Sequence, residues 1–337
     1  MALASLSIVL FHSVAAMVYG ASGDPSSAAL AKEVRSLGWI VYGARSDERD
    51  WDLFLMRPDG SAPHNLTHTK DFNEGMPRFS PDGTRILYRR LPRGEHFDNN
   101  RHGMQGELVV RPVDSSGVQV LGPPGDYPWA SWGPQGEQIA CLSVSGVYFV
   151  DLASRTEVSR RNRSGFFQQM AWSPDGLWLC GVANSFGTGW SVARMEVATG
   201  RVNAVSTVDC CTPDWFPDSR RIIYSHRPGQ WTQLWQADAD GRQRSLVYAE
   251  DGRHVYGGCV SPDGRYVLFT GNHREDGDAE RSGAPMALMR LADAPIIAGA
   301  SPALRKQHPN ANEGPVLILP DGWEPHWTAH DLPGETP

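Results

Sequence analysis

The sequence has 337 residues, a formal net charge of −7 and a pI near 5.9. No run of lysines or arginines is long enough to neutralise several phosphates at once, so we expect no nucleic-acid partner. The densest basic stretch, residues 155–163, is typical of a solvated outer strand. Five cysteines without regular spacing imply no disulfide framework.

Residues 1–22 begin with an apolar stretch followed by small residues, which is the pattern of a secretory signal cleaved near Gly20 or Ala21. No lysine or arginine precedes the apolar part, so a mis-assigned start or an ordinary N-terminal helix is the alternative. No other stretch approaches the ~18 apolar residues of a membrane span. We therefore expect a periplasmic or extracellular protein, with residues 23–38 as a linker.

The first β-unit spans residues 39–67 and is incomplete. It contains three strand-like runs, at 39–42, 52–56 and 65–67, but no turn motif precedes them. Its missing strand is expected at the other end of the chain. There, Glu324 to Thr328 repeats the Pro-x-Trp pattern that opens later units.

A Ser-Pro-Asp-Gly quartet then recurs through the chain, with its third residue repeating every 40 to 53 positions. Proline presets one turn angle, Ser and Asp bond nearby backbone, and Gly accepts a left-handed conformation, so each quartet predicts a tight hairpin. A repeat of this length is typical of solenoids and propellers. The copies are residues 80–83, 173–176 and 261–264, with degenerate copies at 133–136 and 216–219.

Apolar strand-like runs flank every quartet, and a third and a weaker fourth run follow. The pattern predicts an all-β fold, a six-bladed β-propeller of four-stranded antiparallel blades over residues 39–328. Its ring is closed by N- and C-terminal strands that share one blade, and residues 329–337 form a tail. Trp132, Trp172, Trp215 and Trp327 share one repeat position and are expected to pack between blades.

Leu53 to Thr67, followed by Pro77-Arg78-Phe79 and the first quartet, resembles the PD40-type β-propeller repeats of TolB. Propellers of prolyl-oligopeptidase-type peptidases and of oligogalacturonate lyase share these repeats. The resemblance implies the fold but no particular activity. The chain leaves no room for a peptidase domain beside the propeller, and Gly-x-Ser-x-Gly is absent.

Two long polar loops, residues 90–106 and 272–283, are expected on one face of the ring, where strand connections carry function. Together with strand-end residues they predict a ligand-binding rim suited to an anionic or sugar-like ligand. The candidate rim residues are Arg45, Glu74, His96, His102, Tyr127, Asn184, His226, Arg227, His254, His273, Arg274, Trp323 and His326. Trp129, Trp190, Trp231 and Trp323 are candidate sugar platforms.

His226 and His273 follow the second strand of neighbouring units and are candidates to share a divalent ion. Asp276, Asp278 and Glu280 alternate like oxygen ligands for calcium, but the EF-hand register and its closing glutamate are lacking, which favours a solvated acidic loop. The adjacent Cys210 and Cys211 lack the Cys-x-x-Cys spacing of zinc sites, and a structural role is expected for them.

Two functional classes remain. The first is a non-catalytic, exported, monomeric TolB-like propeller that binds a protein, peptide or glycan partner through its rim and central funnel, with no cofactor. The second resembles oligogalacturonate lyase, in which a divalent metal on His226 and His273 would neutralise a uronate while His96 or His102 acts as base. The absence of an assembled nucleophile and base favours the first class.

Overall fold

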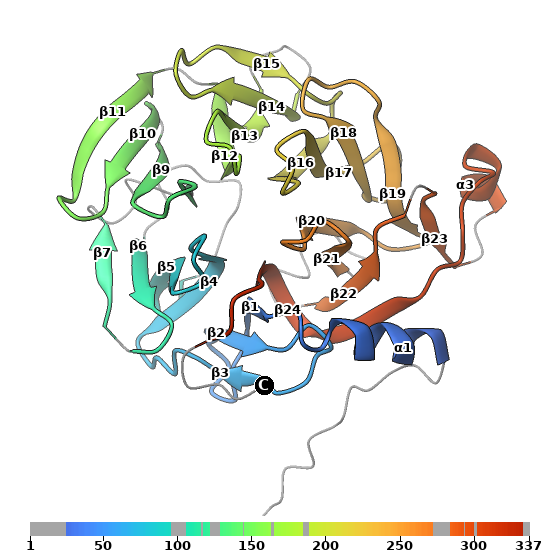
Figure 1. The fold of residues 1–337 in the computed structure, drawn as a ribbon, viewed down its shortest axis with the longest axis horizontal. Coiled ribbons are helices and arrows are strands. Elements are labelled where there is room, and N and C mark those ends of the chain that lie inside the picture. Colours follow the sequence, from blue (N-terminus) through green and yellow to red (C-terminus); the bar gives the residue numbers. More distant parts are fainter. Residues whose placement is uncertain are drawn as a thin grey trace, which may run out of the picture.

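The computed structural model describes residues 25–95, 106–115, 117–121, 129–143, 145–162, 165–184, 189–271, 284–292, 294–299 and 302–332. Within them the fold is all-β with two short helices, and the mostly antiparallel sheets stand around a common axis like the blades of a propeller (Figure 1). Neither helix is both long and apolar enough to cross a membrane, as judged on these residues.

Hydrogen bonding separates five sheets. Three of them have four strands each. The first contains β4 (Phe72–Phe79), β5 (Arg85–Pro92), β6 (Glu107–Pro112) and β7 (Gln119–Leu121), and the second β8 (Trp129–Trp132), β9 (Gln138–Ser143), β10 (Gly146–Asp151) and β11 (Thr156–Asn162). The third contains β12 (Phe166–Trp172), β13 (Trp178–Ala183), β14 (Ser191–Glu196) and β15 (Val202–Ala204).

The fourth sheet has five strands: β16 (Cys210–Trp215), β17 (Arg221–His226), β18 (Gln233–Asp238), β19 (Ser245–Glu250) and β23 (Ile296–Ala298), which pairs parallel with β19. The fifth has seven: β20 (Val255–Val260), β21 (Tyr266–Gly271), β22 (Ala284–Arg290), β24 (Val316–Thr328), β1 (Trp39–Arg45), β2 (Trp51–Met56) and β3 (His64–Asn65).

The long strand β24 joins the two ends of the chain. Its first half pairs with β22, with Leu317 opposite Leu288, and its second half pairs with β1, with Trp327 opposite Ile40. The predicted pairing of residues 324–328 with the first unit is therefore found. Six separate four-stranded sheets are not found, because β24 continues through two neighbouring sheets and β23 adds to a third.

The predicted hairpins are confirmed at the quartets. Ser80 Oγ donates to Asp82 Oδ1 (2.5 Å) and accepts from the Arg85 amide (2.9 Å), while Asp82 Oδ1 also accepts from the Thr84 amide (3.1 Å). Gly83 has φ +70°, in the left-handed region that glycine tolerates. The same bonds recur at Ser173-Asp175 and Ser261-Asp263.

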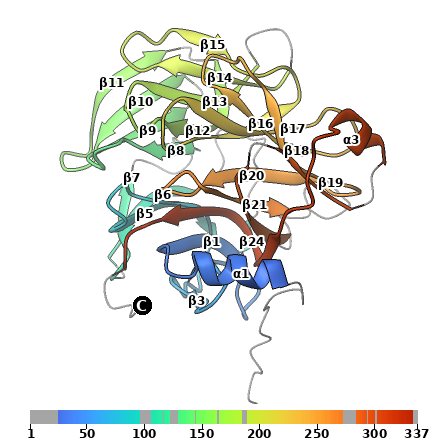
Figure 2. The same ribbon diagram turned by 45° about the vertical axis from the view of Figure 1, so that its right-hand side comes forward.

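The expected linker contains a helix, α1 (Pro25–Val34), which lies along β24 (Figure 2). Leu30 and Val34 are buried against the sheet, and Glu33 bonds both Tyr266 and Arg290. The short Ser- and Ala-rich stretch becomes helical because it has an apolar face to bury. A second helix, α3 (Pro302–Gln307), follows β23.

The repeated tryptophans pack between sheets, as predicted from their shared position. Trp132, Trp215 and Trp327 are buried, and Trp172 is half-buried. Three of the indole N–H groups donate to distant backbone carbonyls. Trp132 and Trp215 donate to the innermost strand of the preceding sheet, at Arg78 (2.9 Å) and Ala171 (3.1 Å), and Trp327 donates to Leu37 (2.7 Å), between α1 and β1. These hydrogen bonds connect neighbouring parts of the ring.

We expect Trp132→Phe to lower the free energy of unfolding by roughly 2–3 kcal/mol, because the Arg78 carbonyl loses its donor and packing volume is lost. Trp172 is the matched control, since its indole N–H bonds Gly176 within its own turn. Trp172→Phe should cost only about 1 kcal/mol. Urea denaturation measures both; equal losses would show that the bond between sheets contributes nothing.

Candidate functional site

Five of the six innermost strands have a β-bulge halfway along their length, whereas β8 pairs with β9 without a register shift. The register shifts at Gly75/Arg78 on β4, Gln168/Ala171 on β12, Cys211/Asp214 on β16, Tyr256/Cys259 on β20 and Trp323/His326 on β24. The bulges place residues at positive φ: Met76 (57°), Gln169 (50°), Thr212 (47°), Gly257 (64°) and Glu324 (46°). Bulges re-aim side chains, and strained residues of this kind cluster at functional sites.

One repeat position is aromatic in five of the six innermost strands and is Val260 in β20, and the residues directly before it all line one cavity on the axis. We call them the axial ring: Arg78, Ser131, Ala171, Asp214, Cys259 and His326, from β4, β8, β12, β16, β20 and β24. Side chains alternate along a strand, so the aromatic residue turns between sheets and its predecessor turns to the axis. The ring residues thus occupy equivalent positions but differ in chemistry.

The cavity around the axial ring has a volume of about 360 Å³ and extends toward the hairpin turns. Its walls are partly apolar: they include the four repeated tryptophans and a set of prolines from the turns, Pro81, Pro134, Pro174, Pro217 and Pro262. Small-molecule pockets typically span about 300–1,000 Å³, so this outer chamber is large enough for a small ligand.

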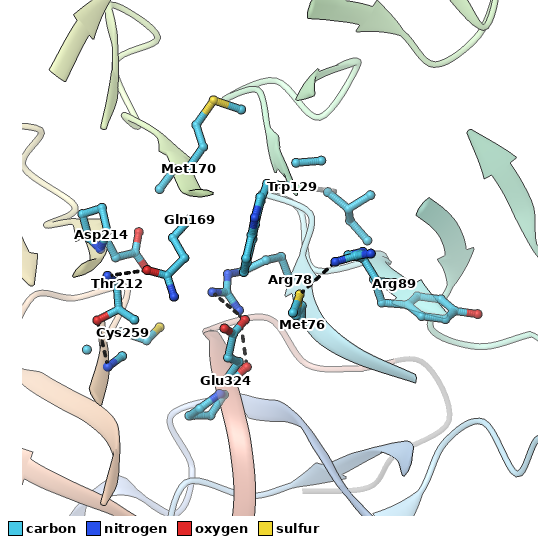
Figure 3. A pocket seen from close by; sticks show the side chains of 18 of the residues that line it. Met76, Arg78, Arg89, Trp129, Gln169, Met170, Thr212, Asp214, Cys259 and Glu324 are labelled. Carbon is cyan, nitrogen blue, oxygen red and sulfur yellow. Dashed lines mark hydrogen bonds and ion pairs between the residues drawn. The ribbon is translucent and has the colours of Figure 1, made fainter. Parts of the chain in front are cut away.

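A smaller inner chamber of about 60 Å³ lies at the bulges (Figure 3). Arg78 and Asp214 line both chambers, and Arg89 and Glu324 line the inner one. Figure 3 shows Arg78 beside Glu324, with Asp214 and Thr212 across the cavity. Two cations and two carboxylates therefore meet at the centre of the molecule.

Arg78 is anchored by one side of its guanidinium. Nη1 donates to the carbonyls of Pro77 (2.9 Å) and Glu324 (3.3 Å). Nη2 lies 3.7 Å from Glu324 Oε2, beyond hydrogen-bond distance, and the side chain is 34 % exposed. Among the described residues, no acceptor takes a hydrogen bond from its Nε or Nη2.

The two carboxylates of the site are poorly solvated. Burial raises the pKa of Asp214, with the Arg78 charge opposing it. Burial likewise raises the pKa of Glu324 against Arg78 and Arg89, and Glu324 Oε2 makes no hydrogen bond to the described residues. Burial lowers the pKa of Arg89 to about 10. The two carboxylates would each gain from a further partner of opposite charge.

His326 was predicted on the rim but belongs to the axial ring. Its Nδ1 accepts a hydrogen bond from the Phe79 amide (3.1 Å), and burial together with the Arg78 charge lowers its pKa to about 3. The imidazole is therefore neutral at physiological pH and acts as an acceptor between two strands. Of the candidate rim residues that the structure describes, only His326 lines either chamber.

Three other candidate rim residues are buried among neighbouring side chains, so the expectation that they lie on an exposed rim is corrected. Glu74 is fully buried. His254 is 3 % exposed and bonds Thr232 Oγ1 (3.0 Å), and Trp323 packs edge-on against Trp51 (6.3 Å between ring centroids). At these positions the side chains point toward neighbouring parts of the fold and are buried there instead of facing solvent.

The remaining candidates divide between the surface and residues beyond the description. Arg45, Asn184 and Arg227 are exposed, and His226 is half-buried against Trp235 (5.2 Å between ring centroids). His96, His102, Tyr127, His273 and Arg274 lie outside the described residues, as do Asp276, Asp278 and Glu280. Of the candidate sugar platforms, Trp129 is buried, Trp231 half-buried against His254, and Trp190 exposed.

Of the two histidines predicted to share a divalent ion, the structure describes only His226. Burial lowers the pKa of His226, so its imidazole is available as a neutral ligand, but His273 is not described. Among described residues no three His, Cys, Asp or Glu side chains gather as metal ligands. The shared divalent ion stays a prediction. All five cysteines, including Cys210 and Cys211, are free of disulfides.

No protein-family model matches the sequence, and no curated protein matches it. Solved structures do share its fold. TolB from Acinetobacter baumannii aligns with a TM-score of 0.61 and 17% identity over 87% of this chain and 67% of that one. A putative TolB from Agrobacterium tumefaciens gives 0.52 and 17% over 75% and 84%, and a nidogen/laminin complex 0.55 and 7% over 75% and 90%. The resemblance to TolB propellers holds at the level of the fold.

Proposed function

We propose that this chain is a non-catalytic, TolB-like binding protein that takes a protein, peptide or glycan partner through its rim and central funnel. The single observation that carries the proposal is the axial ring, where Arg78 and Asp214 have unused hydrogen-bonding capacity and line a cavity with partly apolar walls. This cavity opens at the hairpin turns, at the opposite end of the strands from the rim position Arg45. Ligand sites combine apolar walls with a few placed polar groups in this way.

The proposal includes a six-bladed ring. The seven-stranded sheet is counted as two blades that share β24, one with β20 to β22 and one with β1 to β3. With the four remaining sheets this makes six, and the six strands that supply the axial ring become the innermost strands of six blades. A closed ring would hold the axial residues rigidly, which reduces the entropic cost of binding.

We further propose that the protein is exported. The support is the signal-like pattern in residues 1–22. Expression of the full sequence followed by cell fractionation and N-terminal sequencing tests this. Mature protein beginning near residue 21 or 22 in the periplasm or medium is expected, whereas uncleaved protein retained in the cytoplasm would contradict export.

Site-specific photo-crosslinking tests the binding role. A photoreactive amino acid at the exposed rim position Arg45 should capture one discrete partner in producing cells, because the rim is proposed to meet it. The same residue at Asn203, exposed on outer strand β15, is the matched control. Equal labelling from both positions, or none from the rim, would contradict a partner at this face.

A further inference from the structure

The axial ring places opposite charges on opposite sides of one cavity. Neighbouring inner strands follow the order β24, β4, β8, β12, β16 and β20 around the axis. Arg78 on β4 and Asp214 on β16 are therefore three positions apart in a ring of six. Ser131 and Ala171 lie between them on one side of the ring, and Cys259 and the larger His326 on the other.

One edge of the Arg78 guanidinium makes no hydrogen bond to the described residues, although its Nη2 lies in an ion pair with Glu324 Oε2 at 3.7 Å. Its Nη1 side is fixed on two backbone carbonyls, whereas Nε and Nη2 donate to no atom of the described residues. A guanidinium presents Nε and Nη2 as a planar fork that matches the two oxygens of a carboxylate. The backbone anchors hold that fork in place before any ligand arrives.

Asp214 has unused acceptor capacity on the other side. Its Oδ1 accepts from the Trp215 amide (2.8 Å), and Oδ2 accepts no hydrogen bond from the residues that the structure describes. Glu324 Oε2 is in the same condition near Arg78. An ammonium group carries three donors and no acceptor, so it satisfies such carboxylate oxygens.

The charge balance of the site selects for a ligand that carries both charges. Arg78 and Arg89 are matched by Asp214 and Glu324, so a ligand with a net charge would leave one buried group uncompensated. A phosphate or another polyanion fits poorly for this reason. The outer chamber of about 360 Å³, with its tryptophans and prolines, would receive apolar substituents.

We propose that the axial cavity binds a small zwitterion with an apolar side chain, an amino acid or a short peptide, with its carboxylate on Arg78 and its ammonium on Asp214. This deepens the proposed binding role and rests on it. The two sources share one chemistry and differ in the distance between the charged groups, which the probes below distinguish.

Isothermal titration with defined probes tests the assignment: free phenylalanine, the dipeptide Val-Phe, its C-terminal amide and its N-acetyl form. The better-bound of the first two identifies the source. The amide and the N-acetyl form should each bind about tenfold more weakly than Val-Phe, the loss expected for one charge-assisted hydrogen-bonded contact.

The variants Arg78→Gln and Asp214→Asn assign each end of the ligand. In Arg78→Gln, Val-Phe and its amide should bind equally, while the N-acetyl form still binds more weakly. In Asp214→Asn the pattern should reverse. Arg220→Gln is the control, because Arg220 is exposed beside the hairpin turn of β16 and lines neither chamber.

Ala171→Leu provides a test that leaves both charges in place. It fills the cavity from β12 and should abolish binding of every probe while thermal unfolding stays close to that of the wild type. Binding of no zwitterionic probe, discrimination that survives in both charge variants, or undiminished binding by Ala171→Leu would overturn the proposal. If crosslinking from the rim captures a partner but no probe binds, this inference fails and the proposed partner role stands. If a probe binds but the rim captures no partner, the proposed partner role fails instead.

Discussion

Replacing Gly38 with alanine should destabilise the protein by at least ~3 kcal/mol, because a β-carbon there meets fixed backbone as well as torsional strain. Gly38 has φ +96°, and an added Cβ would lie 1.9 Å from the Thr328 carbonyl oxygen and 2.8 Å from Ala329 Cα. The glycine directly precedes β1, and Thr328 ends β24. The clash therefore falls where the two ends of the chain meet.

Gly264→Ala is the matched control. Gly264 has φ +75°, and an added Cβ would meet nothing within 4 Å, so the substitution should cost only about 1 kcal/mol of backbone strain. Urea denaturation of both variants measures the difference. A loss in Gly38→Ala no larger than in Gly264→Ala would show that the junction of β1 and β24 contributes little to stability.

Replacing Glu74 with glutamine should flatten the pH dependence of stability. Burial raises the pKa of Glu74 to about 7, with the Thr67 side chain and the Arg111 charge opposing this less strongly. The folded protein therefore binds a proton that the unfolded chain, with its ordinary pKa of 4.5, has released. The stability from the protonated form is complete below pH 4.5 and is lost as the pH rises to about 7.

The expected size of this effect follows from the pKa difference. At about 1.4 kcal/mol per pKa unit, the wild type should lose roughly 3 kcal/mol more than Glu74→Gln between about pH 4.5 and 8. Denaturant titrations at several pH values give the two slopes. Glu137→Gln, at an exposed turn position, should run parallel to the wild type. Parallel curves for Glu74→Gln would mean that Glu74 titrates normally.

The fold could be predicted from the sequence because its signals are local. Each Ser-Pro-Asp-Gly quartet satisfies its own turn, and the pattern around Trp327 marks a strand that belongs with the first unit. The double pairing of β24 and the parallel pairing of β23 with β19 could not be predicted in this way. Both depend on which distant strand edge is free, and only the assembled sheets decide that.

The site was predicted less well, because the candidate residues were chosen from loops and strand ends, whereas the axial ring lies on the innermost strands. His254 directly precedes β20 and Trp323 lies within β24, and the partners of both side chains come from distant parts of the chain. Arg78 and Asp214 had a usable signal: each directly precedes the repeated aromatic residue. Alternation places such residues on the opposite side from the aromatic ring, toward the axis.

A crystal structure of the purified protein with Val-Phe tests the central claim most directly, because it locates the ligand and the axial ring together. We expect the dipeptide between the inner strands, with its carboxylate on the Nε and Nη2 edge of Arg78 and its ammonium on Asp214. Density for the dipeptide only on the outer surface, or Arg78 and Asp214 turned into the sheet interfaces away from the axis, would contradict the account.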